Sequence, residues 1–135
     1  MRSPAEDAPR RYVVVDSDPY DSDRDTQYLH LNRTLGPVHA GRWLDDLELA
    51  INDLTEFPGP LSHARDEDAA DFYGREVRRM FYYGPTRKRI GTLVRVLFTV
   101  HPPVGDEPPE TAEWVLFLLR LLGGGQALAP EEEPA

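Results

Sequence analysis

Residues 40–54 read AGRWLDDLELAINDL, and this stretch decides the fold class. Its apolar residues recur at the three- and four-residue spacing that places them along one face of an α-helix, while acidic residues occupy the other faces. A helix with one apolar face has to cover that face against another element, so the stretch predicts a helix that packs on a core. The stripe consists of Ala40, Trp43, Leu44, Leu47, Ala50, Ile51 and Leu54.

The segment before this stripe predicts a second helix. Asp18-Pro19 is expected to open it, because Asp caps helix N-termini and Pro is tolerated in the first turn. Gly36-Pro37 ends it and starts the next helix, which leaves almost no connecting chain. With so short a link, the two helices are expected to form an antiparallel hairpin.

Strands are predicted on both sides of this hairpin. Tyr12–Val15 is a short β-branched run, and residues 76–83 form a second candidate. Every second residue from Ile90 to Val100 is apolar or Thr, which predicts a strand with one face on the core. Residues 114–122 are apolar apart from Arg120, and both helix and strand suit so short a run. A central strand is favoured, because the preceding strands need a partner.

The expected order is therefore β-α-α-β-β-β. This is an α+β domain in which the helical hairpin lies on one face of a small, mostly antiparallel sheet. Residues 10–124 are expected to form the domain, between a flexible tail at residues 1–9 and an acidic, Pro-rich tail at residues 125–135. Residues 61–71 are predicted to be a polar loop, and residues 84–89 a turn.

The composition excludes several classes of protein. No apolar run reaches the roughly 18 residues of a membrane helix, and we expect neither a signal peptide nor a membrane partner. The absence of cysteine excludes disulfides, thiolate metal sites and a Cys nucleophile, and it suits a cytoplasmic protein. No glycine-rich phosphate loop, Ser-His-Asp order or zinc spacing is present, so no metal and no cofactor are expected.

Charge is distributed unevenly along the chain, whose formal net charge is −9. From Asp16 to Asp71, four arginines stand against fourteen acidic residues. From Phe72 to His101, seven Arg and Lys residues stand against one acidic residue. A basic hairpin flanked by aromatic residues, in an otherwise acidic chain, indicates a surface that selects a partner.

Five motifs follow one another along the chain: Trp43-Leu44-Asp45, Leu54-x-x-Phe57-Pro58, Gly74-Arg75-Glu76-Val77-Arg78-Arg79, Val94-Arg95-Val96-Leu97-Phe98 and Leu119-Arg120-Leu121-Leu122-Gly123-Gly124. With these motifs, and with its elements in this order, the chain resembles the RelE/ParE toxin superfamily of type II toxin–antitoxin modules over about residues 12–124, and the fold expected is RelE/ParE-like. This chain departs from the family in three places. The family's last strand commonly reads Arg-x-x-His-Gly, and Gly123 holds the His position here; the chain is acidic where members are usually basic; and residues 102–109 exceed the family's usual tight turn.

The resemblance implies a cytoplasmic toxin of the plasmid-stabilisation kind, neutralised by an antitoxin in a complex that can assemble further. Three functions stay open. A ParE-like, gyrase-directed toxin, active or degenerate, is favoured because an acidic chain suits RNA poorly and the general acid/base residue is missing. The alternatives are a RelE-like, ribosome-dependent mRNA endoribonuclease and a non-toxic protein-binding module.

Arginines supply the candidate catalytic residues, Arg79, Arg95 and Arg120. In an RNA-cleaving protein they would neutralise phosphate and the charge developing at the cleaved bond. The alternative is that they pair with the protein's own acidic residues. Arg120 in particular faces either a functional groove or an internal carboxylate, such as Glu113 or one on a helix.

The partner-binding surface is expected on the basic hairpin. An antitoxin tail would add a strand or lay an amphipathic helix there, with acidic residues meeting the arginines. The two tyrosines of the hairpin either stack on bases or cover the edge of the sheet. The expected surface consists of Arg75, Arg78, Arg79, Tyr82, Tyr83 and Arg95.

Overall fold

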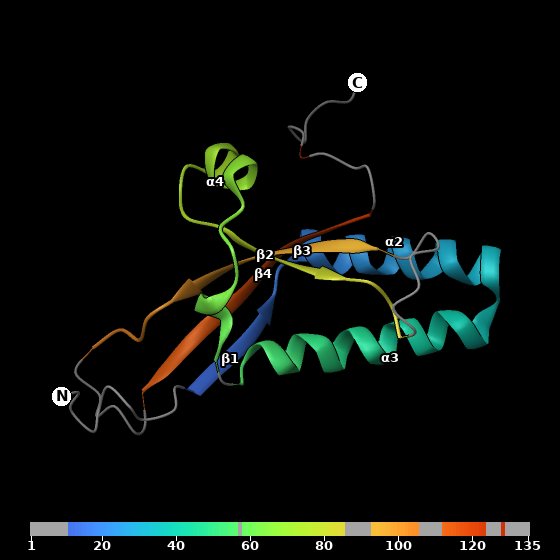
Figure 1. Ribbon diagram of the computed structural model, residues 1–135, viewed down its shortest axis with the longest axis horizontal. Coiled ribbons are helices and arrows are strands. Elements are labelled where there is room, and N and C mark those ends of the chain that lie inside the picture. The colour runs from blue at the N-terminus through green and yellow to red at the C-terminus, as the bar shows by residue number, and fades with distance from the viewer. Residues whose placement is uncertain (1–10, 57, 86–92, 106–111, 124–127, 129–135) are drawn as a thin grey trace.

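A computed structural model describes residues 11–56, 58–85, 93–105, 112–123 and 128, and these form an α+β fold (Figure 1). No helix within these ranges combines the length and apolarity that crossing a bilayer requires. The strands are β1 (Arg11–Asp16), β2 (Arg78–Tyr82), β3 (Val94–His101) and β4 (Glu113–Gly123). The helices are α2 (Asp18–Leu35), α3 (Pro37–Leu54) and α4 (Glu67–Tyr73), with a 3-10 turn, η1, at Pro60–Ser62.

The four strands form one sheet in the order β1-β4-β3-β2. β1 runs parallel to β4, whereas β4 with β3 and β3 with β2 are antiparallel, so the sheet is mixed and mostly antiparallel. β4 lies between β1 and β3, which confirms the prediction that residues 114–122 form a central strand.

The helical hairpin of α2 and α3 covers one face of this sheet (Figure 1). Five of the seven residues of the predicted stripe on α3 are buried there, with Trp43 and Leu47 almost completely enclosed, and Leu44 and Ala50 are partly buried. The stripe packs in one cluster with alternate residues of β3, which confirms the predicted contact. The partners on the sheet are Val94, Val96 and Phe98 of β3 and Leu116, Leu118 and Leu121 of β4.

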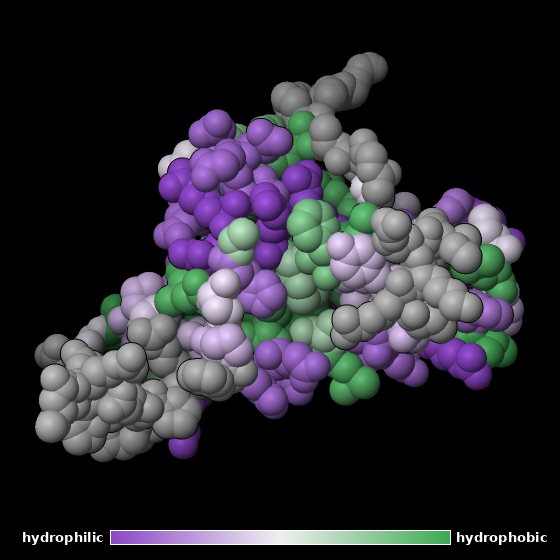
Figure 2. Space-filling view, in the orientation of Figure 1, coloured by the Kyte–Doolittle hydropathy of each residue, from purple (hydrophilic) through white to green (hydrophobic). Residues whose placement is uncertain are grey.

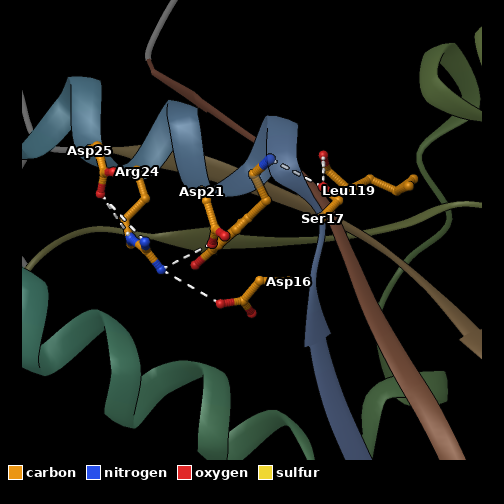
Figure 3. Close-up of polar contacts among 7 residues, drawn as sticks. Asp16, Ser17, Asp21, Arg24, Asp25 and Leu119 are labelled. Atoms are coloured by element: carbon orange, nitrogen blue, oxygen red, sulfur yellow. Dashed lines mark hydrogen bonds and ion pairs between the residues drawn. The ribbon is translucent and has the colours of Figure 1, made fainter.

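The N-cap of α2 lies one residue earlier than predicted. Ser17, not Asp18, is the N-cap: its hydroxyl accepts a hydrogen bond from the Tyr20 N–H at 3.1 Å. The same hydroxyl donates to the carbonyl of Leu119 in β4 at 3.0 Å (Figure 3), so the cap also attaches the helix to the sheet. At the other end, Gly36 has φ of 94°, a value that favours glycine, and it joins α2 directly to α3.

The opposite face of the sheet carries α4, a helix that was not predicted. Residues 61–71 were expected to be a loop, and that expectation is wrong because η1 and α4 occupy most of the segment. In Figure 2, hydrophilic side chains gather over α4, and its buried side is small, with only Ala69 and Ala70. A second core cluster joins Ala69, Val77, Leu97, Leu119 and Leu122 beneath it.

This second cluster corrects the prediction that only one face of β3 contacts a core. Leu97 points to the α4 side and is fully buried, while its neighbour Phe98 is fully buried on the hairpin side. The register of β3 with β4 shifts between these two residues, as at a β-bulge. β3 is therefore covered on both faces along its middle.

Some predicted segments begin and end at other residues than the observed elements, and others lie outside the described residues. β2 begins at Arg78, not at residue 76, and ends one residue before 83. Residues 86–92 lie outside the described residues, and with them most of the predicted turn and the first part of the alternating strand. Both predicted tails also lie outside the described residues, apart from Leu128. Leu128 packs against the second cluster.

Replacing Leu47 by Ala is expected to lower the free energy of unfolding by about 2–5 kcal/mol, because Leu47 is 0% exposed and the change leaves a cavity. Leu49→Ala is the matched control on the same helix: Leu49 is 61% exposed, so its loss should stay within about 0.5 kcal/mol. Urea unfolding of the two variants measures the difference, and equal effects would contradict the packing of α3.

Candidate functional site

Asp66 joins the basic hairpin to α4. It is 1% exposed and is the N-cap of α4, where its Oδ1 accepts the Ala69 N–H at 2.9 Å. Its Oδ2 lies 3.0 Å from Nη1 of Arg95 and 3.8 Å from Nη1 of Arg79. A buried carboxylate is costly without partners, so the two arginines compensate its charge. The same contacts neutralise part of the positive charge predicted to meet RNA or an antitoxin.

The three catalytic candidates share one face of the sheet. Leu97 of β3 pairs with Arg79 of β2 on one side and with Arg120 of β4 on the other. These three residues therefore form one row across the sheet. Arg95 lies on the same face, two residues before Leu97. Strand spacing puts the backbones of Arg79 and Arg120 about 10 Å apart. Leu97 lies between them and is buried beneath α4. The structure therefore brings the arginines to one face, but α4 covers the sheet surface between Arg79 and Arg120.

Arg120 pairs with an internal carboxylate, which decides between the two alternatives open for this residue. Its Nε lies 2.6 Å, and its Nη2 3.0 Å, from the two carboxylate oxygens of Asp23 on α2. This bidentate hydrogen bonding raises the pKa of Arg120, against the opposing effect of burial. Asp23 Oδ2 also accepts the backbone N–H of Leu121 at 2.9 Å, so the pair fastens α2 to β4.

The remaining residues of the predicted partner surface are divided between the interior and the surface. Arg78 donates to the carbonyl of His63 at 2.6 Å and pairs with Glu76, while Arg75 is exposed. Tyr82 is 5% exposed; its hydroxyl lies 2.8 Å from Oδ2 of Asp46 and 3.1 Å from the carbonyl of Trp43. Burial and the contact with Asp46 raise the pKa of Tyr82. Its ring belongs to the core and is not presented to a base, whereas Tyr83 is 36% exposed.

A groove of about 530 Å³ lies between α3 and the edge strand β2. Two acidic residues, Asp46 and Asp53, line it from α3, and exposed Leu49 lies beside them. Aromatic side chains line it from β2 and the residue that follows, including Phe81, which is 46% exposed. The groove therefore combines apolar surface with negative charge.

The edge of β2 is covered at its start and open further along. The Arg79 N–H donates to the carbonyl of Ala64 at 3.0 Å, which shows that the backbone groups of Arg79 point away from β3. In an antiparallel ladder the same direction recurs two residues later, at Phe81. No residue in the described ranges hydrogen-bonds these outward groups of Phe81. Phe81 therefore offers an open strand edge beside the groove.

Three features of the site were not predicted from the sequence: the role of Asp66, the pairing of Asp23 with Arg120, and the open edge at Phe81. Asp66 was recognisable in principle, because Asp66 and Gly74 have the spacing of an N-cap and a C-terminal glycine around a short helix. Gly74 has φ of 70°, the left-handed conformation that ends a helix. No local signal pairs Asp23 with a residue 97 positions away.

Comparisons of the chain with protein-family models, with curated proteins and with solved structures find no match. The resemblance to the RelE/ParE superfamily therefore stays a prediction from the motifs and the order of elements in this chain. Among the described residues, no group of three or more His, Asp or Glu side chains is placed to hold a metal ion.

Replacing Asp66 by Asn is expected to lower the free energy of unfolding by about 1–3 kcal/mol, because the buried charge-assisted contacts with Arg79 and Arg95 are lost. Asp68→Asn is the control, since Asp68 is an exposed acidic residue in the first turn of the same helix, and its effect should stay within about 0.5 kcal/mol. Thermal or urea unfolding would contradict the role of Asp66 if both variants lost the same stability.

Proposed function

We propose that this chain is a toxin-like component of a type II toxin–antitoxin module, with a RelE/ParE-like fold, that acts by binding proteins. Within that superfamily we place it with the ParE-like, gyrase-directed toxins. Its target is then DNA gyrase, its compartment the cytoplasm, and its neutralising partner an antitoxin.

The arrangement of elements supports the assignment to this superfamily. A hairpin of two helices follows the first strand and covers one face of the sheet, and three further strands follow. This is the arrangement that the sequence resemblance implies, with β4 at the centre of the sheet and α4 as an addition before β2.

The observation that carries the choice of protein binding over RNA cleavage is the position of α4. Cleavage of RNA needs arginines that can meet phosphate, since neutralisation of the backbone dominates affinity for nucleic acids. Here α4 packs on the face that bears Arg79, Arg95 and Arg120, and these side chains are only 23–34% exposed. Asp66 pairs with Arg95 and Arg79, and Asp23 pairs with Arg120. A face arranged in this way supports a structural role for the arginines.

The groove beside β2 supports a site for the antitoxin. An extended segment can add to the open edge at Phe81, using backbone hydrogen bonds for affinity and side-chain contacts for specificity. Basic side chains of that segment would face Asp46 and Asp53, and its apolar side chains would cover Phe81 and Leu49. Exposed Arg75 lies outside the groove lining and remains available to acidic residues of the same partner.

Expression of the chain without an antitoxin is expected to slow bacterial growth modestly, because it acts through a protein target and Gly123 stands where the nucleases of the family carry a His. The purified protein is expected to inhibit supercoiling by gyrase, and primer extension is expected to find no site-specific mRNA cuts. Such cuts would favour the RelE-like endoribonuclease. Normal growth together with unaffected gyrase would favour the non-toxic binding module.

Replacing Phe81 by Pro should weaken binding of the antitoxin by at least about tenfold, because Pro removes the outward N–H that a partner strand needs. The fold should tolerate the change, since that N–H makes no bond within the described sheet. Phe81→Ala keeps the N–H and removes the ring, so it separates backbone pairing from side-chain contact. Calorimetry with the product of the neighbouring reading frame measures both, and unchanged affinity for the Pro variant would place the antitoxin elsewhere.

A further inference from the structure

A second, open cavity of about 570 Å³ lies where the end of β1 meets α2 and α3. Among the described residues it shares only Leu49 with the groove beside β2. Its apolar lining comes from Val14, Ile51 and Leu118, and its polar lining includes Asp16 from β1 and Asp45 and Glu48 from α3. An apolar base with acidic groups around it suits a ligand that has a hydrocarbon stem and a cationic end.

Among the described residues that line this cavity, the one cation is Arg24. Several carboxylates surround it, including Asp16, Asp21 and Asp25 (Figure 3). Its Nη1 lies 3.5 Å from Asp16 Oδ2 and 3.2 Å from Asp21 Oδ1, and its Nε lies 3.4 Å from Asp25 Oδ1. The contact with Asp21 is an ion pair without hydrogen-bond geometry, because Oδ1 is buried and accepts no hydrogen bond. Burial, together with the charges of Asp21 and Glu48, raises the pKa of Asp16 although Arg24 opposes this. Negative charge is therefore left uncompensated.

Tyr20 gives independent evidence for a ligand. Its side chain is 3% exposed and lines the cavity, and the Arg24 guanidinium lies 5.9 Å from its ring centroid. No residue in the described part of the chain hydrogen-bonds its hydroxyl, so this oxygen is left to accept a donor that enters the cavity. Burial and the charge of Asp16 raise the pKa of Tyr20, so the group stays protonated and offers lone pairs to a donor.

We propose that this cavity binds the alkylguanidinium group of an arginine side chain that another protein supplies. Asp45 and Glu48 are three residues apart and share a face of α3, so together they can accept the planar fork of N–H donors. The Tyr20 hydroxyl accepts a further N–H, and the hydrocarbon stem lies against Val14 and Ile51. Apart from Leu49, the site shares no described lining residue with the groove proposed for the antitoxin, and it does not depend on that function.

Titration of the ¹⁵N-labelled full chain with butylguanidinium tests the site, with butylurea as the uncharged control of the same shape. We expect saturable shifts of amide signals in residues 14–24 and 45–52 with butylguanidinium alone, weaker at high salt. Asp45→Asn combined with Glu48→Gln should weaken this binding by about tenfold or more, because charge-assisted hydrogen bonds are lost. Asp53→Asn, on the same helix but outside the cavity lining, should leave it unchanged.

Tyr20→Phe should weaken the binding at least about threefold without lowering the midpoint of thermal unfolding, since the hydroxyl makes no bond within the described fold. Equal shifts with butylurea, or no effect of the double substitution, would overturn the site. A capped peptide with one arginine should bind more tightly than butylguanidinium, and its citrulline counterpart should not bind. A peptide that binds no better than butylguanidinium would overturn the assignment to a partner protein.

Discussion

β4 is an apolar strand of eleven residues that has to be covered on both faces and both edges, and the rest of the structure depends on this constraint. β3 pairs along one edge, but β1 reaches only to Leu118 on the other. Beyond that point the start of α2 replaces a strand, because Ser17 donates to the Leu119 carbonyl and Asp23 accepts the Leu121 N–H. These contacts fix α2, and with it α3, against the sheet.

The same constraint accounts for α4 and for the state of the arginines. The side of the sheet opposite the hairpin carries Leu97, Leu119 and Leu122, which need cover of their own. A helix of seven residues, α4, supplies this cover, and its N-cap Asp66 lies against the strands that carry Arg79 and Arg95. Covering the apolar surface therefore brings a carboxylate to the basic hairpin. The arginines become part of the fold, and the open surfaces lie instead along α3.

The fold was predictable where a pattern extends over many residues. The stripe on α3 and the apolar run of β4 identify a helix and a central strand, because burial on one face or on both leaves a periodic or continuous signal. α4 leaves no such signal, since it buries only Ala69 and Ala70 and its other residues are polar.

The candidate site was less predictable, because its contacts join residues far apart in the chain. The arginines were recognisable as a group, but their partners were not. Asp66 lies 29 residues from Arg95, and Asp23 lies 97 residues from Arg120. A charge pattern locates a basic segment in the sequence, whereas the packing of the two cores determines whether that segment faces a partner or the protein's own carboxylates.

Amide hydrogen exchange of α4 tests most directly the claim that α4 covers the arginine-bearing face. In the structure the Ala69 N–H bonds the Asp66 side chain and the Ala70 N–H bonds its carbonyl. If α4 is a stable cover, both amides should exchange only through openings that cost on the order of 3 kcal/mol or more. Exchange of both amides at the rate of an unstructured peptide, with the amide of Leu97 still protected, would show that α4 leaves the sheet in solution and would contradict the account.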